Sequence, residues 1–371
     1  MENMQILTND TIHELLINLT KDEANQFRTT IEQTLQDFSI GQERQYQPDP
    51  NAITRPNGQR TLFRPFTSDT SVGAKIVVEP APAPNGKKDP LHGLIILMDG
   101  KGNPTGVLSA EEVTGYRTSM NAMVPFCWRK DVDNIVIFGG GVQALWHARL
   151  ILTLRGDEVK TITFVKPFRD RVDVLIATLS GENEARWRSS CSFHFIDTVA
   201  GDFEERIQEC LSEADCVICT TPSKMPLFPA AYLTKRDGAR QPFISAIGAW
   251  QSDMIELDPA LLHHAIAAEG GFNPATAEGR GVVLVDDRDF ALHNSGEVVQ
   301  SAIAASDMVE VGQIVGLRSG KTKPVNPEHV ERANKFISQG FVVYKSIGVG
   351  LTDLTAANAV LALRKKKEHR L

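Results

Sequence analysis

The stretch that decides the fold is Ile135-Val136-Ile137-Phe138-Gly139-Gly140-Gly141-Val142-Gln143-Ala144. Its first four residues predict a short apolar strand, and residues 142–155 predict a helix. In the pattern G-x-G-x-x-A, Gly139 permits a tight turn, Gly141 lets the backbone approach a pyrophosphate, and Ala144 keeps the helix close to the strand. The helix N-terminus then offers N–H donors to an anion. The stretch therefore predicts a dinucleotide site that includes Val142 and Gln143, and a glycine-rich turn without a ligand is the alternative.

The same strand-helix rhythm continues after this turn. Apolar segments at 161–165, 215–220, 243–247 and 282–285 alternate with helical segments. Such alternation predicts a parallel sheet covered by helices on both faces, which is the α/β class. We therefore predict a dinucleotide-binding domain of the doubly wound Rossmann type over residues 129–324.

The two ends of the chain have a different pattern. Residues 1–45 show helix spacing, and strands are predicted at 61–63, 74–78 and 91–99. After residue 324 the chain predicts a helix, a strand at 341–346 and a final helix.

Composition excludes several classes of protein. The 371 residues carry 39 Lys+Arg against 46 Asp+Glu, a formal net charge of −7, which argues against a nucleic-acid partner. No apolar run approaches the ~18 residues of a membrane span. The N-terminus resembles no secretory signal, and five cysteines in a chain of this length favour reduced thiols. We therefore expect a cytoplasmic protein with no membrane contact.

The end of the predicted strand 161–165 bears on the choice of nicotinamide cofactor. A carboxylate there would bind ribose hydroxyls and favour NAD. The sequence has Lys166, Arg169 and Arg171 instead, which could receive a 2′-phosphate. NADP(H) is therefore favoured, but NAD(H) stays possible because Asp170 and Asp173 could make this a solvated charged turn. No metal site is expected, since Cys216 and Cys219 lie inside an apolar strand without a second cysteine pair.

Two cations occur where a packed core is expected. Lys75 interrupts the apolar strand 74–78, and Arg117 lies within a helix of mostly uncharged residues. A cation in such surroundings needs a structural carboxylate or a bound anion.

Taken together, these segments resemble the ornithine cyclodeaminase/μ-crystallin family. The resemblance runs from about residue 50 to about residue 360 and rests on motifs that occur in this order: Gly73-Ala74-Lys75, Leu94 to Asp99, Val113-Thr114 with Arg117-Thr118, Gly139 to Ala144, Ile247-Gly248 with Glu256-Leu257-Asp258, Ser295-Gly296-Glu297, and Lys345-Ser346-Ile347-Gly348 with Asp353. It implies a homodimer. It also implies a substrate-binding and dimerisation domain of the α+β type, built from both chain ends, here 1–128 and 325–371.

The resemblance also assigns roles to individual residues. A Lys and two Arg hold the substrate carboxylate in the family, and Lys75 and Arg117 match two of them. Arg55 is our choice for the other arginine, with Arg60 and Arg64 as competitors. Asp353 matches a position near the nicotinamide, although it could simply cap the last helix. Cofactor-lining positions of the family fall on Thr220, Thr221 and Gly248.

Two departures from the cyclodeaminases matter. Trp250 replaces the Asp that acts as base in cyclisation, and Leu62 replaces a Glu thirteen residues before Lys75. Without these carboxylates a free δ-amine would lose its partner and its base. We do not expect Asp253 to substitute. The departures resemble the cyclic ketimine reductases and place Trp250 in the substrate site.

The leading hypothesis is an NAD(P)H-dependent reductase of a cyclic imino acid, such as pyrroline- or piperideine-2-carboxylate. Arg55, Lys75 and Arg117 would hold the carboxylate, and Lys75 would keep the imine nitrogen protonated. The alternatives are an amino-acid cyclodeaminase, which is an ammonia lyase, an amino-acid dehydrogenase, or a non-catalytic NADPH- and ligand-binding protein.

Overall fold

The computed structural model describes residues 4–83, 89–235, 240–249, 251–322 and 326–369. The chain forms two compact units. The first unit contains the residues up to Arg117 and those from Val349 onward, and the second unit runs from Thr118 to Gly348. The α/β fold class predicted from the sequence is confirmed, with a parallel sheet in the second unit and an α+β first unit.

The first unit is built on a six-stranded sheet in the order β1-β6-β5-β4-β3-β2. Strands β2 to β6 pair antiparallel in sequence order, and β1 pairs parallel with β6. Their bounds are β1 (Gln5–Leu7), β2 (Asn51–Thr54), β3 (Arg60–Thr67), β4 (Ser71–Glu79), β5 (His92–Asp99) and β6 (Pro104–Ser109).

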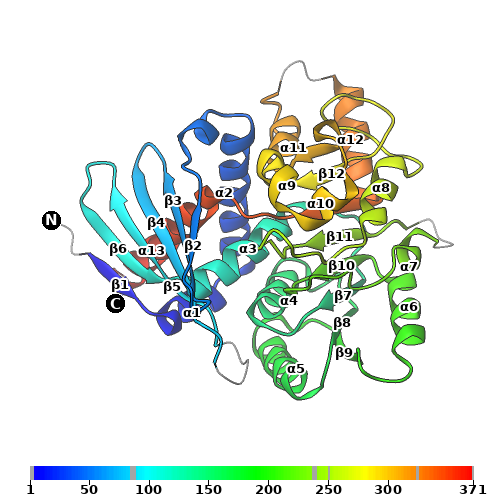
Figure 1. The fold of residues 1–371 in the computed structure, drawn as a ribbon, viewed down its shortest axis with the longest axis horizontal. Coiled ribbons are helices and arrows are strands. Elements are labelled where there is room, and N and C mark those ends of the chain that lie inside the picture. Colours follow the sequence, from blue (N-terminus) through cyan, green and yellow to red (C-terminus); the bar gives the residue numbers. More distant parts are fainter. Residues whose placement is uncertain (1–3, 84–88, 236–239, 250, 323–325, 370–371) are drawn as a thin grey trace. The chain divides into compact units, whose positions relative to one another are not determined.

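Helices from both chain ends cover one face of this sheet. They are α1 (Asn9–Ile17), α2 (Lys21–Ser39), the short η1 (Glu43–Tyr46) and α13 (Gly350–Glu368), while α3 (Ala110–Phe126) begins in this unit. Helix α2 begins at a capping box in which Thr20 and Glu23 bond each other's backbone N–H groups. Helix α13, red in Figure 1, contacts α2 and strands β3, β4 and β5. The chain's last helix thus packs on a sheet made by its first third.

The second unit holds an eight-stranded parallel sheet in the order β13-β12-β14-β11-β10-β7-β8-β9. Its strands are β7 (Asn134–Phe138), β8 (Thr161–Lys166), β9 (Ser192–Asp197), β10 (Cys216–Cys219), β11 (Phe243–Ala246), β12 (Val283–Val285), β13 (Met308–Glu310) and β14 (Val342–Lys345). The chain runs outward from β7 to β9 and then returns to β10 on the other side of β7. The strand order therefore reverses between β7 and β10, which is where ligands bind in such sheets.

Helices cover both faces of the parallel sheet. They are α4 (Val142–Arg155), α5 (Asp170–Glu182), η2 (Asn183–Trp187), α6 (Phe203–Glu213), α7 (Ala231–Thr234), α8 (Pro259–Ala267), α9 (Arg288–Asn294), α10 (Gly296–Ser301), η3 (Ala305–Asp307), α11 (Val311–Arg318) and α12 (Pro327–Gln339). Figure 1 shows α4 and α5 on the side of strands β7 to β9 opposite α6 and α7.

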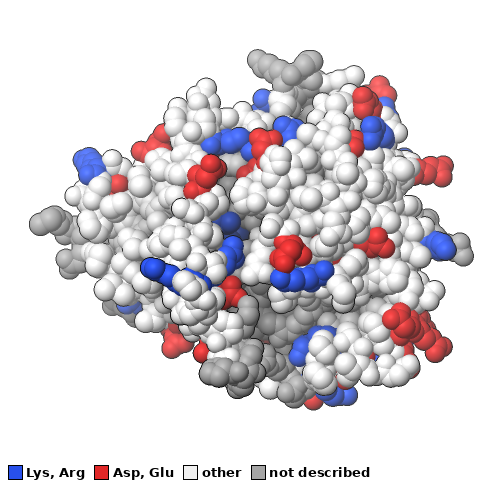
Figure 2. All heavy atoms as spheres, viewed as in Figure 1, with Lys and Arg blue, Asp and Glu red and all other residues white. Residues whose placement is uncertain are grey.

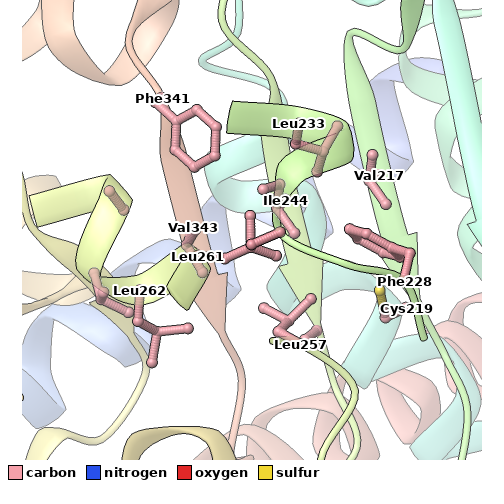
Figure 3. Packing of buried hydrophobic residues seen from close by; sticks show 14 of the residues in the cluster. Val217, Cys219, Phe228, Leu233, Ile244, Leu257, Leu261, Leu262, Phe341 and Val343 are labelled. Atoms are coloured by element: carbon pink, nitrogen blue, oxygen red, sulfur yellow. The ribbon is translucent and has the colours of Figure 1, made fainter. Parts of the chain in front are cut away.

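The core of the second unit lies between the strands and these helices. Figure 3 shows Val217, Ile244 and Val343, from three neighbouring strands, among side chains that include Leu261 of α8 and Leu233 of α7. The continuous apolar strands are explained by burial on both faces, as expected for a parallel sheet.

The boundaries between the two units differ from the predicted domain boundaries at 128/129 and 324/325. In the structure they lie between Arg117 and Thr118 and between Gly348 and Val349. The C-terminal difference arises because β14 pairs in parallel with both β11 and β12 and is therefore an internal strand of the large sheet.

Candidate functional site

Three cations and one carboxylate meet on the helix-covered face of the first unit's sheet. Arg64 on β3 lies directly opposite Lys75 on β4, so the two side chains share a face. Like charges in this arrangement repel. Asp353, in the first turn of α13, supplies the opposite charge from the helix that packs on these strands.

The carboxylate of Asp353 is fully buried and close to all three cations. Lys75 Nζ donates to its Oδ1 at 2.8 Å, and Arg117 Nε donates to the same oxygen at 2.7 Å. Arg64 Nη1 lies 4.0 Å from Oδ2. Arg117 is itself buried, and its Nη1 has no hydrogen-bond partner among the described residues. An unpaired guanidinium N–H group of this kind is suited to a further anion.

The three cations and Asp353 shift one another's ionisation. Three positive charges face one negative charge, which leaves an excess of two when all four groups are ionised. Burial lowers the pKa of Lys75 to about 7, with Arg117 and Arg64 also lowering it and Asp353 opposing them. Burial disfavours ionisation of Asp353, but Arg117, Lys75 and Arg64 together lower the pKa of that carboxyl to about 2. Lys75 can therefore gain or lose a proton near neutral pH while Asp353 stays charged.

The structure thus brings Lys75, Arg117 and Asp353 together, and it adds Arg64 rather than Arg55. Arg55 is exposed at the turn between β2 and β3, where its backbone N–H bonds to Gln59. Arg60 begins β3 opposite Glu79. Strand register, which the spacing of arginines does not reveal, places the competitor Arg64 and not Arg55 beside Lys75. Which arginine binds a substrate carboxylate stays a prediction. Asp353 is not the N-cap of α13, because Val349 holds that position.

The glycine turn of the second unit has the geometry of a dinucleotide site. Gly139 has φ +119°, and a Cβ at this position would lie 2.4 Å from Thr220 Oγ1. Gly141 is the N-cap of α4, and no atom would lie within 4 Å of a Cβ there. Val142 is exposed beside this open space, whereas Ala144 is buried against the strand. Because the turn leaves space at the helix N-terminus, the residues present fit the pyrophosphate of a nicotinamide dinucleotide.

The basic residues proposed for a 2′-phosphate lie at the end of β8. The stem of Lys166 runs over Gly140, and its Nζ lies 3.5 Å from the carbonyl oxygen of Phe168. Arg169 is exposed and pairs with Asp173 at 2.9 Å. The side chain of Arg171 lies outside the described residues, although its backbone is part of α5.

The remaining predicted cofactor residues follow β10 and β11. Thr220 Oγ1 donates to the carbonyl of Phe138 at 2.8 Å, which places it beside the glycine turn. Thr221 and Gly248 both donate backbone N–H groups to Glu256, a functional candidate that was not predicted from the sequence. The sequence could have indicated Glu256, because it is a charged residue among apolar neighbours, as Lys75 is. Trp250 lies outside the described residues.

The described residues form neither a metal site nor a membrane-spanning helix. In the described part of the chain, no three His, Cys, Asp or Glu side chains gather as a metal site would require. Within that same part, no helix is both long and apolar enough to cross a bilayer. The face shown in Figure 2 carries Lys and Arg scattered among Asp and Glu.

No family model matches the chain, but related proteins are found. An uncharacterized cyclodeaminase of Dictyostelium discoideum is 27% identical over 307 residues, covering 80% of this chain and 77% of that protein. The ketimine reductase μ-crystallin of Mus musculus is 27% identical over 271 residues, covering 72% and 67%. A Δ1-pyrroline-2-carboxylate reductase of Bacillus cereus is 25% identical over 344 residues, covering 87% of both chains. The resemblance to the ornithine cyclodeaminase/μ-crystallin family is confirmed.

Solved structures share the fold over nearly the whole chain. The Δ1-pyrroline-2-carboxylate reductase of Thermococcus litoralis, in complex with NADH and L-proline, matches with a TM-score of 0.71 at 17% identity and covers 99% of both chains. An archaeal alanine dehydrogenase dimer with bound NAD matches with a TM-score of 0.70 at 18% identity, covering 98% of this chain and 97% of that one.

Replacing Asp353 with Asn is expected to destabilise the chain by about 3–5 kcal/mol, because two buried cations, Lys75 and Arg117, lose their counter-charge. Asp253→Asn is the matched control, since Asp253 is exposed and pairs with an exposed lysine. Its effect should stay below about 1 kcal/mol. Denaturant unfolding of the three proteins measures both values, and equal losses for the two variants would contradict the structural role of Asp353.

Stability should also depend on pH through Lys75. Its pKa falls from an ordinary 10.5 to about 7 in the folded chain. The folded chain therefore binds fewer protons than the unfolded chain between these two values, and the free energy of unfolding should rise with pH across that window. Denaturant unfolding at several pH values in the window should show a smaller rise for Lys75→Met than for the wild type. Equal slopes would show that folding does not lower the pKa of Lys75.

Proposed function

We propose that this protein is an NAD(P)H-dependent reductase of a cyclic imino acid, a ketimine such as pyrroline- or piperideine-2-carboxylate. The observation that carries the proposal is the group of Arg64, Lys75 and Arg117 around Asp353, with its excess of positive charge. The names of the Mus musculus and Bacillus cereus relatives support this reaction type.

The first unit would bind the substrate carboxylate. Among the described residues, the buried Nη1 of Arg117 has no hydrogen-bond partner, and Arg64 lies at the edge of the same group. Guanidinium groups bind carboxylates through two parallel hydrogen bonds, so a second carboxylate beside Asp353 would use this capacity. It would also neutralise part of the excess charge.

Lys75 would act as the proton donor. With a pKa of about 7 it can exist as an ammonium that protonates the imine nitrogen and as a neutral amine afterwards. Asp353 accepts a hydrogen bond from Lys75 Nζ and so orients it. A nicotinamide cofactor held at Gly139, Gly141 and Thr220 would supply the hydride to the imine carbon. Hydride and proton together convert the C=N bond to CH–NH, which yields a cyclic amino acid.

The cofactor is proposed to be NADP(H) in preference to NAD(H). Lys166 and Arg169 at the end of β8 support this choice, because each could meet a 2′-phosphate. The pairing of Arg169 with Asp173 is the observation that favours NAD(H) instead.

A cyclodeaminase is the second candidate, since the Dictyostelium relative bears that name. The structure gives it less support. Leu62 on β3 is buried on the same face as Arg64, where the cyclodeaminases have a glutamate. An apolar side chain there offers nothing to a substrate's distal ammonium group.

The purified protein should oxidise NADPH, and less efficiently NADH, in the presence of either cyclic ketimine. Lys75→Met should lower kcat roughly 10²–10⁴-fold, because the proton donor is lost. Its nicotinamide affinity should remain that of the wild type. Lys160→Met, which alters an exposed lysine, is the control.

The alternatives give different results in the same assay. Ammonia release from ornithine or lysine would favour a cyclodeaminase, and oxidation of an open-chain amino acid would favour a dehydrogenase. Tight NADPH binding without any turnover would favour a ligand-binding protein.

We also propose a homodimer formed through the open face of the first unit's sheet. Residues that point away from the helices include five exposed apolar side chains: Ile6, Ile53, Phe63, Leu94 and Ile96. An antiparallel sheet with one solvated face normally carries polar residues there. A contiguous apolar face calls for a partner, and a second copy of the same face is self-complementary about a two-fold axis. The archaeal alanine dehydrogenase with this fold is described as a dimer.

The double variant Leu94→Lys, Ile96→Lys should dissociate the dimer, because it buries two unpaired charges in the interface. Light scattering should then report a mass near 40.8 kDa instead of twice that value. Val174→Lys is the control, since Val174 is equally apolar and exposed but lies on α5. A wild-type mass of one chain would reject the homodimer.

A further inference from the structure

Buried charges from three distant segments meet at the ends of strands in the second unit. Glu256, Glu297 and Lys345 are almost completely buried. Lys345 Nζ lies 3.1 Å from Glu297 Oε1, and the same oxygen accepts the backbone N–H of Glu256 at 2.8 Å. Ser295 Oγ donates to the other Glu297 oxygen at 3.0 Å.

Glu256 ties together the loops that follow two neighbouring strands. Its Oε1 accepts hydrogen bonds from the backbone N–H and Oγ1 of Thr221, at 2.6 and 3.0 Å. Its Oε2 accepts the backbone N–H of Gly248 at 2.6 Å. Thr221 follows β10 and Gly248 follows β11, and these strands pair in parallel. One carboxylate therefore fixes two loops at the carboxyl ends of neighbouring strands, where ligands bind in such sheets.

The backbone of Gly248 is held from both sides. Its N–H is bound by Glu256, and its carbonyl oxygen accepts a hydrogen bond from Lys345 Nζ at 2.7 Å. A Cβ at Gly248 would lie 2.8 Å from both Glu256 Oε2 and the carbonyl oxygen of Thr221. The loop after β11 can therefore approach the loop after β10 this closely only with glycine.

We propose that Glu256, Glu297 and Lys345 form a clamp that presets the loops at 220–221 and 247–249 for the nicotinamide dinucleotide, with Glu256 as the positioning residue. The inference rests on the proposed function, because the loops matter only if the dinucleotide binds there. Well-packed apolar residues would stabilise such an interior at least as well as buried ions do. What the ions add is a fixed orientation of four groups, the N–H and hydroxyl of Thr221 and the N–H and carbonyl of Gly248. A loop that is already ordered costs less to order on binding.

Glu256→Gln is the most direct test. The side chain keeps its size, but an NH₂ donor replaces one of the two carboxylate oxygens. This NH₂ group then faces the backbone N–H of Thr221 or Gly248 and cannot accept its hydrogen bond. Hydrogen exchange in peptides that contain Thr221 and Gly248 should become faster without any cofactor present. The dissociation constants for NADPH and NADH should rise at least tenfold. Asp253→Asn makes the same chemical change on an exposed carboxylate three residues away and should alter neither property.

The outcomes separate a positioning role from a structural one. A purely structural role would lower the thermal midpoint of Glu256→Gln while leaving the loop exchange and the dinucleotide affinity of the folded protein unchanged. That result would overturn the clamp. Wild-type protein that binds neither dinucleotide would reject the proposed function itself, whereas wild-type binding with unaltered variant affinity would reject only the clamp.

Gly248→Ala provides a second variant if Glu256→Gln does not fold. It removes no charge, but its Cβ would displace the loop from Glu256 and Thr221. The same loss of dinucleotide affinity is expected, and wild-type affinity in this variant would overturn the proposal.

Discussion

The buried carboxylate of Asp353 is the constraint on which the first unit depends. It allows Lys75, Arg117 and Arg64 to share one face of the sheet, although like charges would otherwise drive them apart. It also joins strands from the first third of the chain to the last helix, because the hydrogen bond between Lys75 and Asp353 spans 278 positions. One carboxylate therefore both links distant segments of the chain and faces three cations.

The second unit uses buried charge in a related way. Its core, seen in Figure 3, is apolar and fixes the strands, but apolar packing does not orient the loops at their ends. Glu256 and Lys345 do so by bonding directly to the backbone of Thr221 and Gly248. In both units, buried ions hold particular polar groups in place through direct hydrogen bonds.

Much of the fold could be predicted from the sequence because its signals are local. The glycine turn at 139–144 and the alternation of apolar and helical segments after it predicted the parallel sheet, but β9 and β13 were not among the predicted strands. The position of β14 could not be predicted in this way. A short buried strand looks the same whichever neighbours it pairs with, and β14 lies between β11 and β12 because of packing between distant segments.

By itself, the sequence determined the class of fold, the glycine turn and the two cations, Lys75 and Arg117, that are out of place in apolar segments. Only the tertiary structure decided that Arg64 and not Arg55 accompanies them, and that Glu256 holds the loops after β10 and β11. The physical reason is the separation along the chain of the residues that interact. Turn geometry and periodicity depend on residues a few positions apart, whereas a buried ion needs partners that strand register and helix packing bring from elsewhere in the chain.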